Sequence, residues 1–182
     1  MPFGRYHPAS NLKAYDTARL VQVALIEQDA SGVELKREQY IIKPAGAYQI
    51  GPESVKIHGI TTELAEAQGE DRMKVLERIV SFCANASEIV CHNANFDVRV
   101  VGSELIRAGL PNVLQDKEID CTMMLGTDIV KIPKPGNYGG YKWPSITELH
   151  THFFGKAFSN AHSAMADVEA CMKCYNKIVG RA

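Results

Sequence analysis

The stretch Ile89-Val90-Cys91-His92-Asn93-Ala94-Asn95-Phe96-Asp97 determines the fold class and the place of the chemistry. Its apolar start predicts a short buried strand over residues 88–91, and the periodicity that follows predicts a helix over residues 95–108. Asp97 then lies at the carboxyl end of a strand, where open α/β sheets bind their ligands. The alternative is that Asn95 or Asp97 only caps the helix, because Asn and Asp are favoured caps.

The flanking sequence predicts strands before this stretch and alternating helices after it. A β-hairpin is expected from residues 19–27 and 33–43, and such an order predicts a mixed α/β sheet flanked by helices. Residues 1–18 and 44–60 lack periodicity and are expected to be loops. The other expected elements are helices over residues 61–68, 70–83, 122–130, 145–155 and 163–179, a strand over 118–121, and a loop over 131–144. The helix over 70–83 is expected to bury Met73, Leu76, Ile79, Val80 and Cys83, which recur at helical spacing.

Length and composition indicate one globular domain over residues 1–182. No apolar run reaches the roughly 20 residues that cross a bilayer, and the N-terminus has no signal-peptide core, so neither a membrane nor secretion is expected. The five cysteines are then expected to be free thiols in a reducing, intracellular compartment, most simply the cytoplasm. The net charge of -1 does not suggest a passive nucleic-acid coat protein, but an enzyme that holds cations with carboxylates need not be basic.

A second cluster of polar residues is Ala161 to Asp167. His162 and Asp167 are five residues apart, about 140° around a helix, so they share no helical face. They can converge if His162 reaches in from the loop before the helix while Asp167 points inward from it. Otherwise His162 is a cap or a surface histidine, and Asp167 lies on a solvated helix face.

Residues 131–144 form a third candidate, in which Lys131, Lys134 and Lys142 alternate with Tyr138, Tyr141 and Trp143. Lysines for phosphates and rings for base stacking suit a single nucleic-acid strand. The alternative is a packed loop in which Trp143 and Pro144 anchor the next helix. A Cys-x-x-Cys pair, Cys171 and Cys174, has apolar helical neighbours and no further ligands nearby, so core packing is expected there rather than zinc.

The Asn-x-x-Phe-Asp element ending at Asp97, followed about seventy residues later by His162 and Asp167, resembles the DEDD exonucleases. Within them it resembles the histidine subclass, which includes ribonuclease T and the proofreading subunit of bacterial replicative polymerase. The resemblance runs from about Arg19 to Val179. It includes residues 19–24, similar to the family's second strand, and residues 57–61, similar to the segment before its second motif.

This resemblance implies a ribonuclease H-like fold and a metal-dependent 3′→5′ exonuclease that removes nucleotides from the 3′ ends of single-stranded DNA or RNA. The family uses two Mg²⁺ or Mn²⁺ ions, which Asp97 and Asp167 would bind, with His162 as general base. Such ions neutralise charge on the attacking and leaving oxygens, and they prefer carboxylate ligands. The attacking water must also lose a proton, which a histidine can accept near neutral pH. The resemblance also allows a homodimer or a polymerase partner. The residues that match the family's substrate contacts are His58, Asn93, Asn95 and Phe96.

One motif of the family has no counterpart. Its Asp-x-Glu pair lies on a first, central strand, ahead of the segment that matches Arg19, and residues 1–18 contain only one carboxylate, Asp16. Two divalent ions carry four positive charges, against two negative charges from Asp97 and Asp167. We therefore expect a sheet without its first strand, a chain that lacks about one strand and turn, on the order of 10 residues, and impaired activity.

Two other readings of the same residues remain. The chain can be a degenerate exonuclease that only binds nucleic acid or a partner. Alternatively, it is a non-catalytic α/β interaction module whose motif matches are caps and core packing.

Overall fold

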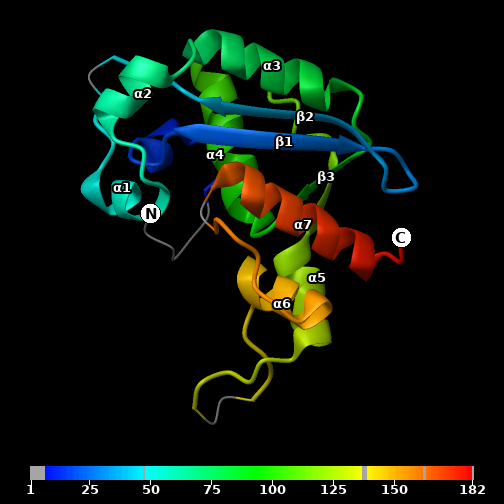
Figure 1. The fold of residues 1–182 in the computed structure, drawn as a ribbon. Coiled ribbons are helices and arrows are strands. Elements are labelled where there is room, and N and C mark those ends of the chain that lie inside the picture. The colour runs from blue at the N-terminus through cyan, green and yellow to red at the C-terminus, as the bar shows by residue number, and fades with distance from the viewer. Residues whose placement is uncertain (1–6, 47, 137–138, 162, 182) are drawn as a thin grey trace. The chain divides into compact units, whose positions relative to one another are not determined.

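The chain folds into an α/β arrangement of short helices and two strand pairs (Figure 1). The structure, a computed structural model, describes residues 7–46, 48–136, 139–161 and 163–181. It divides into two compact units, unit 1 with Met1–Ala24, Glu38–Ile89 and Asn95–Glu118, and unit 2 with Leu25–Arg37, Val90–Ala94 and Ile119–Ala182. In chain order the elements are the 3-10 helix η1 (Leu12–Tyr15), β1 (Gln22–Gln28), β2 (Glu34–Ile41), α1 (Pro52–His58), α2 (Thr62–Gln68), α3 (Arg72–Ala84), β3 (Glu88–Cys91), α4 (Ala94–Arg107), β4 (Glu118–Cys121), α5 (Thr122–Val130), α6 (Ile146–Phe154) and α7 (Ala164–Ile178).

The predicted hairpin is present as the β1–β2 pair, and β3 pairs with β4. The β1–β2 turn is held by Asp29, whose Oδ1 accepts the backbone N–H groups of Ser31 and Val33 at 2.9 and 3.0 Å. Gly32 supplies the positive φ of 91° that this turn needs. The expected mixed α/β class is confirmed. Its sheet content in the described residues is two separate strand pairs rather than one continuous sheet.

Residues 44–60 were expected to be a loop, and this expectation is wrong, because α1 lies within them. Pro52 fixes the first helical φ and Gly59, at φ 73°, ends the helix. No residue of α1 is buried, so no apolar periodicity marked it. The loop expected over residues 1–18 likewise contains the single turn η1, and residues 1–6 lie outside the described part.

Unit 1 has a small apolar core made by Ile50, Ile60 and Ala65. The hydroxyl of Thr62 accepts the backbone N–H of Ile50 at 2.9 Å, which ties the segment before α1 to the start of α2. Partly buried apolar residues of β2, α1, α2 and the segments just before β1 and α1 pack on this core, namely Val21, Ile41, Tyr48, Val55 and Leu64.

The buried face of α3 matches the expected one at Leu76, Ile79 and Cys83 and differs at three other positions. Val75 is buried although it was not expected to be, Val80 is only half-buried, and Met73 is 37% exposed. At 100° per residue the buried stripe centres between Val75 and Leu76, and Met73 lies roughly 100° from that centre.

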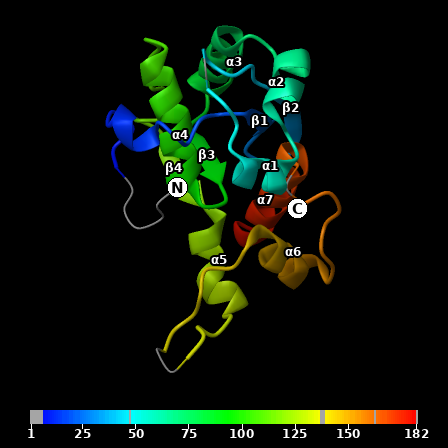
Figure 2. The ribbon, with the colours of Figure 1, turned by 90° about the vertical axis from the view of Figure 1, so that its left-hand side faces the viewer.

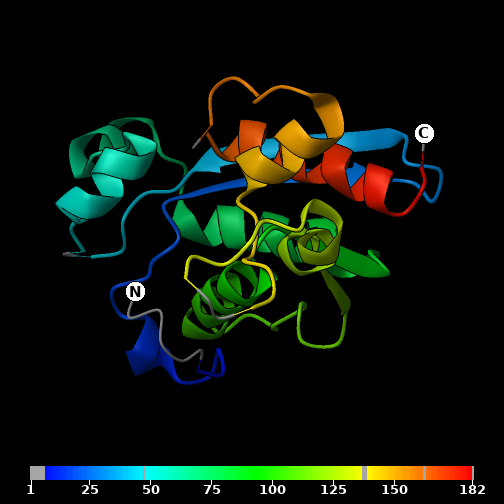
Figure 3. The same cartoon turned by 90° about the horizontal axis from the view of Figure 1, so that it is seen from below.

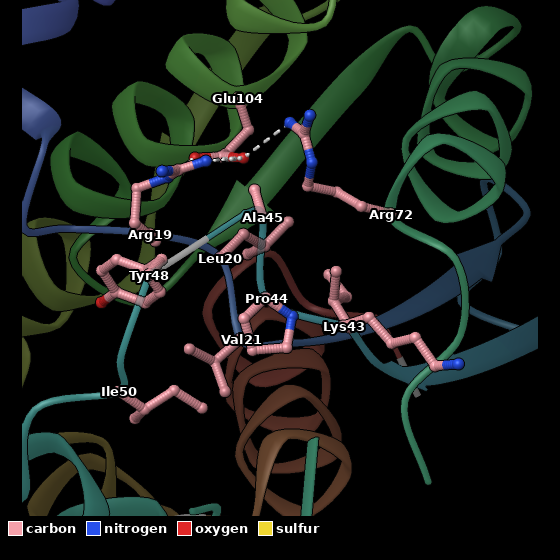
Figure 4. A pocket seen from close by; sticks show the side chains of 11 residues that line it. Arg19, Leu20, Val21, Lys43, Pro44, Ala45, Tyr48, Ile50, Arg72 and Glu104 are labelled. Atoms are coloured by element: carbon pink, nitrogen blue, oxygen red, sulfur yellow. Dashed lines mark hydrogen bonds and ion pairs between the residues drawn. The ribbon is translucent and has the colours of Figure 1, made fainter. Parts of the chain in front are cut away.

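A buried carboxylate joins three segments of unit 1 (Figure 4). Glu104 of α4 is 1% exposed and accepts hydrogen bonds from Arg19, which precedes β1, and from Arg72, the first residue of α3. Arg19 Nη2 lies 3.3 Å from Glu104 Oε2, and Arg72 Nη1 lies 3.4 Å from the same oxygen. Arg107 Nε approaches Oε1 at 3.9 Å. The hydrogen bond from Glu104 raises the pKa of Arg19, against the opposing effect of burial.

Unit 2 is built around α5, α6 and α7, which pack on one another (Figures 2 and 3). Gly126 of α5 allows the close approach of α6, since a Cβ at this position would lie 2.6 Å from a methyl group of Leu149. The expected capping box of α6 is present, with Ser145 Oγ accepting the N–H of Glu148 at 3.2 Å. Cys171 and Cys174 are both buried on α7, as expected.

No helix among the described residues is long and apolar enough to span a membrane.

The Glu104 cluster generates a stability prediction. Glu104→Gln should lower the free energy of unfolding by about 3–5 kcal/mol, because it leaves several arginines around a neutral group. Urea unfolding followed by circular dichroism measures this. The matched control is Glu53→Gln, which breaks the exposed Lys56–Glu53 pair and should cost less than about 1 kcal/mol. Equal losses in the two variants would contradict a central role for Glu104.

Candidate functional site

The turn between β3 and α4 positions the first candidate residues. β3 ends at Cys91, and Asn93 adopts a left-handed φ of 66°, a conformation that Asn accepts more readily than most residues. Because α4 begins at Ala94, Asn95 and Asp97 lie inside its first turn rather than at its cap. Neither residue is therefore the N-cap itself, although the Asp97 carboxyl still accepts one of the unpaired N–H groups of the first turn, its own. Asn95 is exposed, and Phe96 and Asp97 are half-buried.

Asp97 has an unusual environment for a carboxyl group. Desolvation raises its pKa from an ordinary 3.8 to about 7, and a hydrogen bond from its own backbone N–H opposes this only in part. At neutral pH, without a cation, a large fraction of the group is therefore protonated. A bound divalent cation would favour the charged form, and strongly perturbed carboxyls of this kind are concentrated at functional sites.

Asp167 lies in the first turn of α7 and is half-buried. Its backbone N–H donates to the carbonyl of Ser163 at 2.9 Å, the first hydrogen bond of the helix. His162 lies outside the described residues. Asp97 belongs to unit 1 and Asp167 belongs to unit 2.

Contacts within unit 2 hold α7 in place. The hydroxyl of Tyr175 donates to Asp120 Oδ2 on β4 at 2.7 Å, and Cys171 Sγ lies 3.5 Å from Thr122 Oγ1. Arg37 of β2 donates to Glu169 at 2.5 Å. The helix that carries Asp167 is thus attached to β2, β4 and α5.

His58, one of the predicted substrate contacts, makes a hydrogen bond within its own turn. Its Nδ1 accepts the backbone N–H of Ile60 at 3.1 Å, and burial lowers its pKa. The neutral ring therefore closes the turn between α1 and α2 and leaves Nε2 for another partner.

His92 has a role that the sequence did not reveal. Its Nδ1 lies 2.9 Å from Thr122 Oγ1 and its Nε2 lies 3.1 Å from the carbonyl oxygen of Pro144. Burial lowers its pKa, which favours a neutral ring that donates from Nε2 and accepts the threonine hydroxyl at Nδ1. His92 directly follows β3 and Thr122 directly follows β4. This matching position after two paired strands is the sequence signal that could have predicted their contact.

The two predicted metal ligands have the oxygen donors that suit a divalent cation. Asp97 and Asp167 are carboxylates, the ligands that Mg²⁺ and Mn²⁺ prefer. Among the described residues, which do not include His162, no three His, Cys, Asp or Glu side chains gather closely enough to hold a metal. Asp16, the only acid of residues 1–18, forms an ion pair with Arg107 at 3.0 Å.

A recess in unit 1 lies apart from these candidates. It is narrow, with about 10 Å³ available to the centre of a water molecule, and its wall includes Arg19, Tyr48, Arg72 and Glu104 (Figure 4). No predicted site residue lines it.

Solved structures with a similar fold include complexes of E. coli exonuclease I. The complex with a dA16 oligonucleotide is 27% identical, with a TM-score of 0.70, and the match covers 88% of this chain and 37% of that one. The complex with a dT13 oligonucleotide is 27% identical, with a TM-score of 0.71 and the same coverage of both chains. A zinc-bound form of the exonuclease I–ssDNA complex is 28% identical, with a TM-score of 0.69, over 87% of this chain and 36% of that one. The chain thus spans little more than a third of the length of these enzymes.

No sequence among the curated proteins matches the chain. The profile of the exonuclease family RNase_T matches residues 9–175, nearly the whole chain. This match and the shared fold confirm the resemblance to DEDD-type exonucleases that the sequence motifs indicated. The chain therefore belongs to the exonuclease family.

Proposed function

We propose that this chain is a metal-dependent 3′→5′ exonuclease of low activity, acting on single-stranded nucleic acid. The observation that carries the proposal is the position of Asp97. In a chain matched by the exonuclease family over residues 9–175, its carboxyl group follows β3 in the first turn of α4 and has a pKa raised to about 7.

In this proposal the chain's own residues divide the work of phosphodiester hydrolysis. Asp97 and Asp167 would hold the divalent cations, and His162 would take a proton from the attacking water. Asn93, Asn95, Phe96 and the free Nε2 of His58 contact the terminal nucleotide. Bound cations would supply charge neutralisation at the attacking and leaving oxygens.

Single-stranded DNA is the substrate class we propose to test first. The similar structures are exonuclease I bound to deoxyoligonucleotides, which supports a single strand as the ligand. RNA remains the comparison substrate, since no residue of this chain is assigned to a 2′-hydroxyl group. Removal of nucleotides from the 3′ end is part of the proposal and rests on the DEDD resemblance.

The charge balance supports low activity and a second candidate function. Two carboxylates oppose only half of the charge of two divalent cations, and Asp97 resists ionisation without a cation. A chain in this state can bind nucleic-acid ends without cleaving them. Metal dependence separates the two functions, because only cleavage requires the cations.

The activity prediction uses DNA labelled at its 5′ end, with RNA in parallel. Stepwise 3′ shortening should appear with Mn²⁺, stop with EDTA, and be abolished by Asp97→Ala or Asp167→Ala. His162→Ala should slow it by about 10²- to 10⁴-fold, the usual contribution of a general base. The matched control is Asp116→Ala, an exposed aspartate outside the proposed site.

The outcomes of this assay are distinct. Shortening that survives in Asp97→Ala would contradict the proposed metal ligands. Binding without shortening by the folded chain would favour the degenerate reading, and a variant with an added N-terminal Asp-x-Glu strand then tests it. Recovery of metal-dependent cleavage in that variant would show that an added pair of carboxylates is enough for the chemistry.

The raised pKa of Asp97 predicts a pH-dependent stability. Between about pH 4 and 7 the folded state binds more protons than the unfolded state, so unfolding should become easier as pH rises through this window. At about 1.4 kcal/mol per pKa unit, the buried Asp97 carboxylate lowers the free energy of unfolding at pH 8 by on the order of 2–4 kcal/mol. Asp97→Asn removes this cost and should raise the Tm at pH 8 by roughly 5–10 °C, but not at pH 4.

Thermal unfolding at both pH values, without added metal, measures this effect. Asp116→Asn is the control and should leave the Tm unchanged at both. A Tm for Asp97→Asn at or below that of the wild type at pH 8 would show that Asp97 is already well stabilised as a carboxylate.

A further inference from the structure

Residues 131–136 and 139–144 form the two sides of a hairpin, here called the arm, which joins α5 to α6 within unit 2. Pro133 and Tyr141 form an antiparallel bridge, the N–H of Lys142 donates to the carbonyl of Ile132 at 2.8 Å, and that of Lys134 donates to Gly140 at 3.3 Å. The arm extends beyond the ends of α5 and α6 (Figures 1 and 2). Tyr138 lies outside the described residues.

The base of the arm is fixed. Pro144 is fully buried, and its carbonyl oxygen accepts a hydrogen bond from His92. Lys142 Nζ lies 2.5 Å from Glu148 Oε1, and the same glutamate closes the capping box of α6. The arm is therefore held in a defined orientation at its root.

The exposed surface of the arm is aromatic and cationic. Trp143 is 65% exposed and Tyr141 is 38% exposed, so neither ring is part of a core. The exposed Trp143 ring does not fit the packed-loop alternative, whereas the buried Pro144 does. Lys131 and Lys134 are also exposed, and residues 131–144 contain no carboxylate.

The neighbouring elements add apolar surface and little negative charge. On α5, Met124, Leu125 and Ile129 are exposed. The acids beside the arm are Asp128, which is exposed, and Glu148, which is engaged by Lys142. The arm thus presents positive charge and ring faces together.

We propose that the arm binds single-stranded nucleic acid, with Trp143 and Tyr141 stacking on bases and Lys131 and Lys134 contacting phosphates. Charge complementarity favours a polyanion over a protein surface, and every base offers a ring face for stacking without sequence preference. The proposal rests on the proposed function only in its choice of ligand. It adds a contact for the strand that none of the predicted site residues supplies.

Trp143 is the only tryptophan of the chain, so its fluorescence reports directly on the arm. A dT13 oligonucleotide, titrated in EDTA to prevent cleavage, should quench this fluorescence. Anisotropy of labelled dT13 then measures the variants. Trp143→Ala should weaken binding by roughly 5- to 100-fold, whereas Trp143→Phe should retain most of it.

The lysines are tested by the salt dependence of binding. For single strands each phosphate contact contributes about 0.7 to the slope of log K against log salt, so Lys131→Ala with Lys134→Ala should lower the slope by about 1.4. The matched control is Lys173→Ala with Lys177→Ala, two exposed lysines on α7, which should leave the slope unchanged.

Unquenched fluorescence, with wild-type dT13 affinity in both arm variants, would overturn the proposal and leave a protein contact as the use of this surface. If the wild type still shortens DNA with metal in that case, the proposed function stands and only the arm's role fails. Quenching without any metal-dependent shortening would give the reverse result, with the arm's role supported and the nuclease function refuted.

Discussion

Unit 1 depends on one buried carboxylate. Glu104 lies at 1% exposure between Arg19, Arg72 and Arg107, and so ties the entry to β1, the first residue of α3 and the end of α4 together. A buried charge is stable only when it is paired, and the paired guanidiniums lose their partner together if it is removed. The same α4 carries Asp97 in its first turn, so the Glu104 cluster also sets the orientation of the helix that holds a proposed metal ligand.

In unit 2, hydrogen bonds between uncharged groups link the elements, whereas an ionic cluster does so in unit 1. His92 and Thr122 follow the two strands of the β3–β4 pair, and their hydrogen bonds reach the root of the arm at Pro144 and α7 at Cys171. A neutral imidazole suits this place, because burial opposes its charged form and each ring nitrogen has one partner. The same set of hydrogen bonds, centred on His92 and Thr122, therefore holds both the root of the arm and α7, the helix that carries Asp167.

Much of the fold could be predicted, because its signals are local. The β1–β2 hairpin has alternating residues around a polar turn, and α6 begins with Ser145 and Glu148 at capping-box spacing. The helix α1 escaped prediction because none of its residues is buried, and Met73 was misplaced because tertiary packing selects one side of α3. The motif singled out Asp97 as a candidate, and its role stays a prediction. Its raised pKa and the bonds of His92 depend on residues distant in sequence, which no local pattern records.

Asp97 shows why a site of this kind costs stability in the absence of its ligand. The desolvation that raises its pKa penalises the carboxylate in the folded chain, so the group would be better tolerated as an amide. The same desolvation strengthens any interaction with a cation, because water no longer screens the charge. A residue placed only for folding would avoid this conflict, whereas Glu104 resolves it with arginines. Under the proposed function, a bound divalent cation would supply the compensating charge at Asp97.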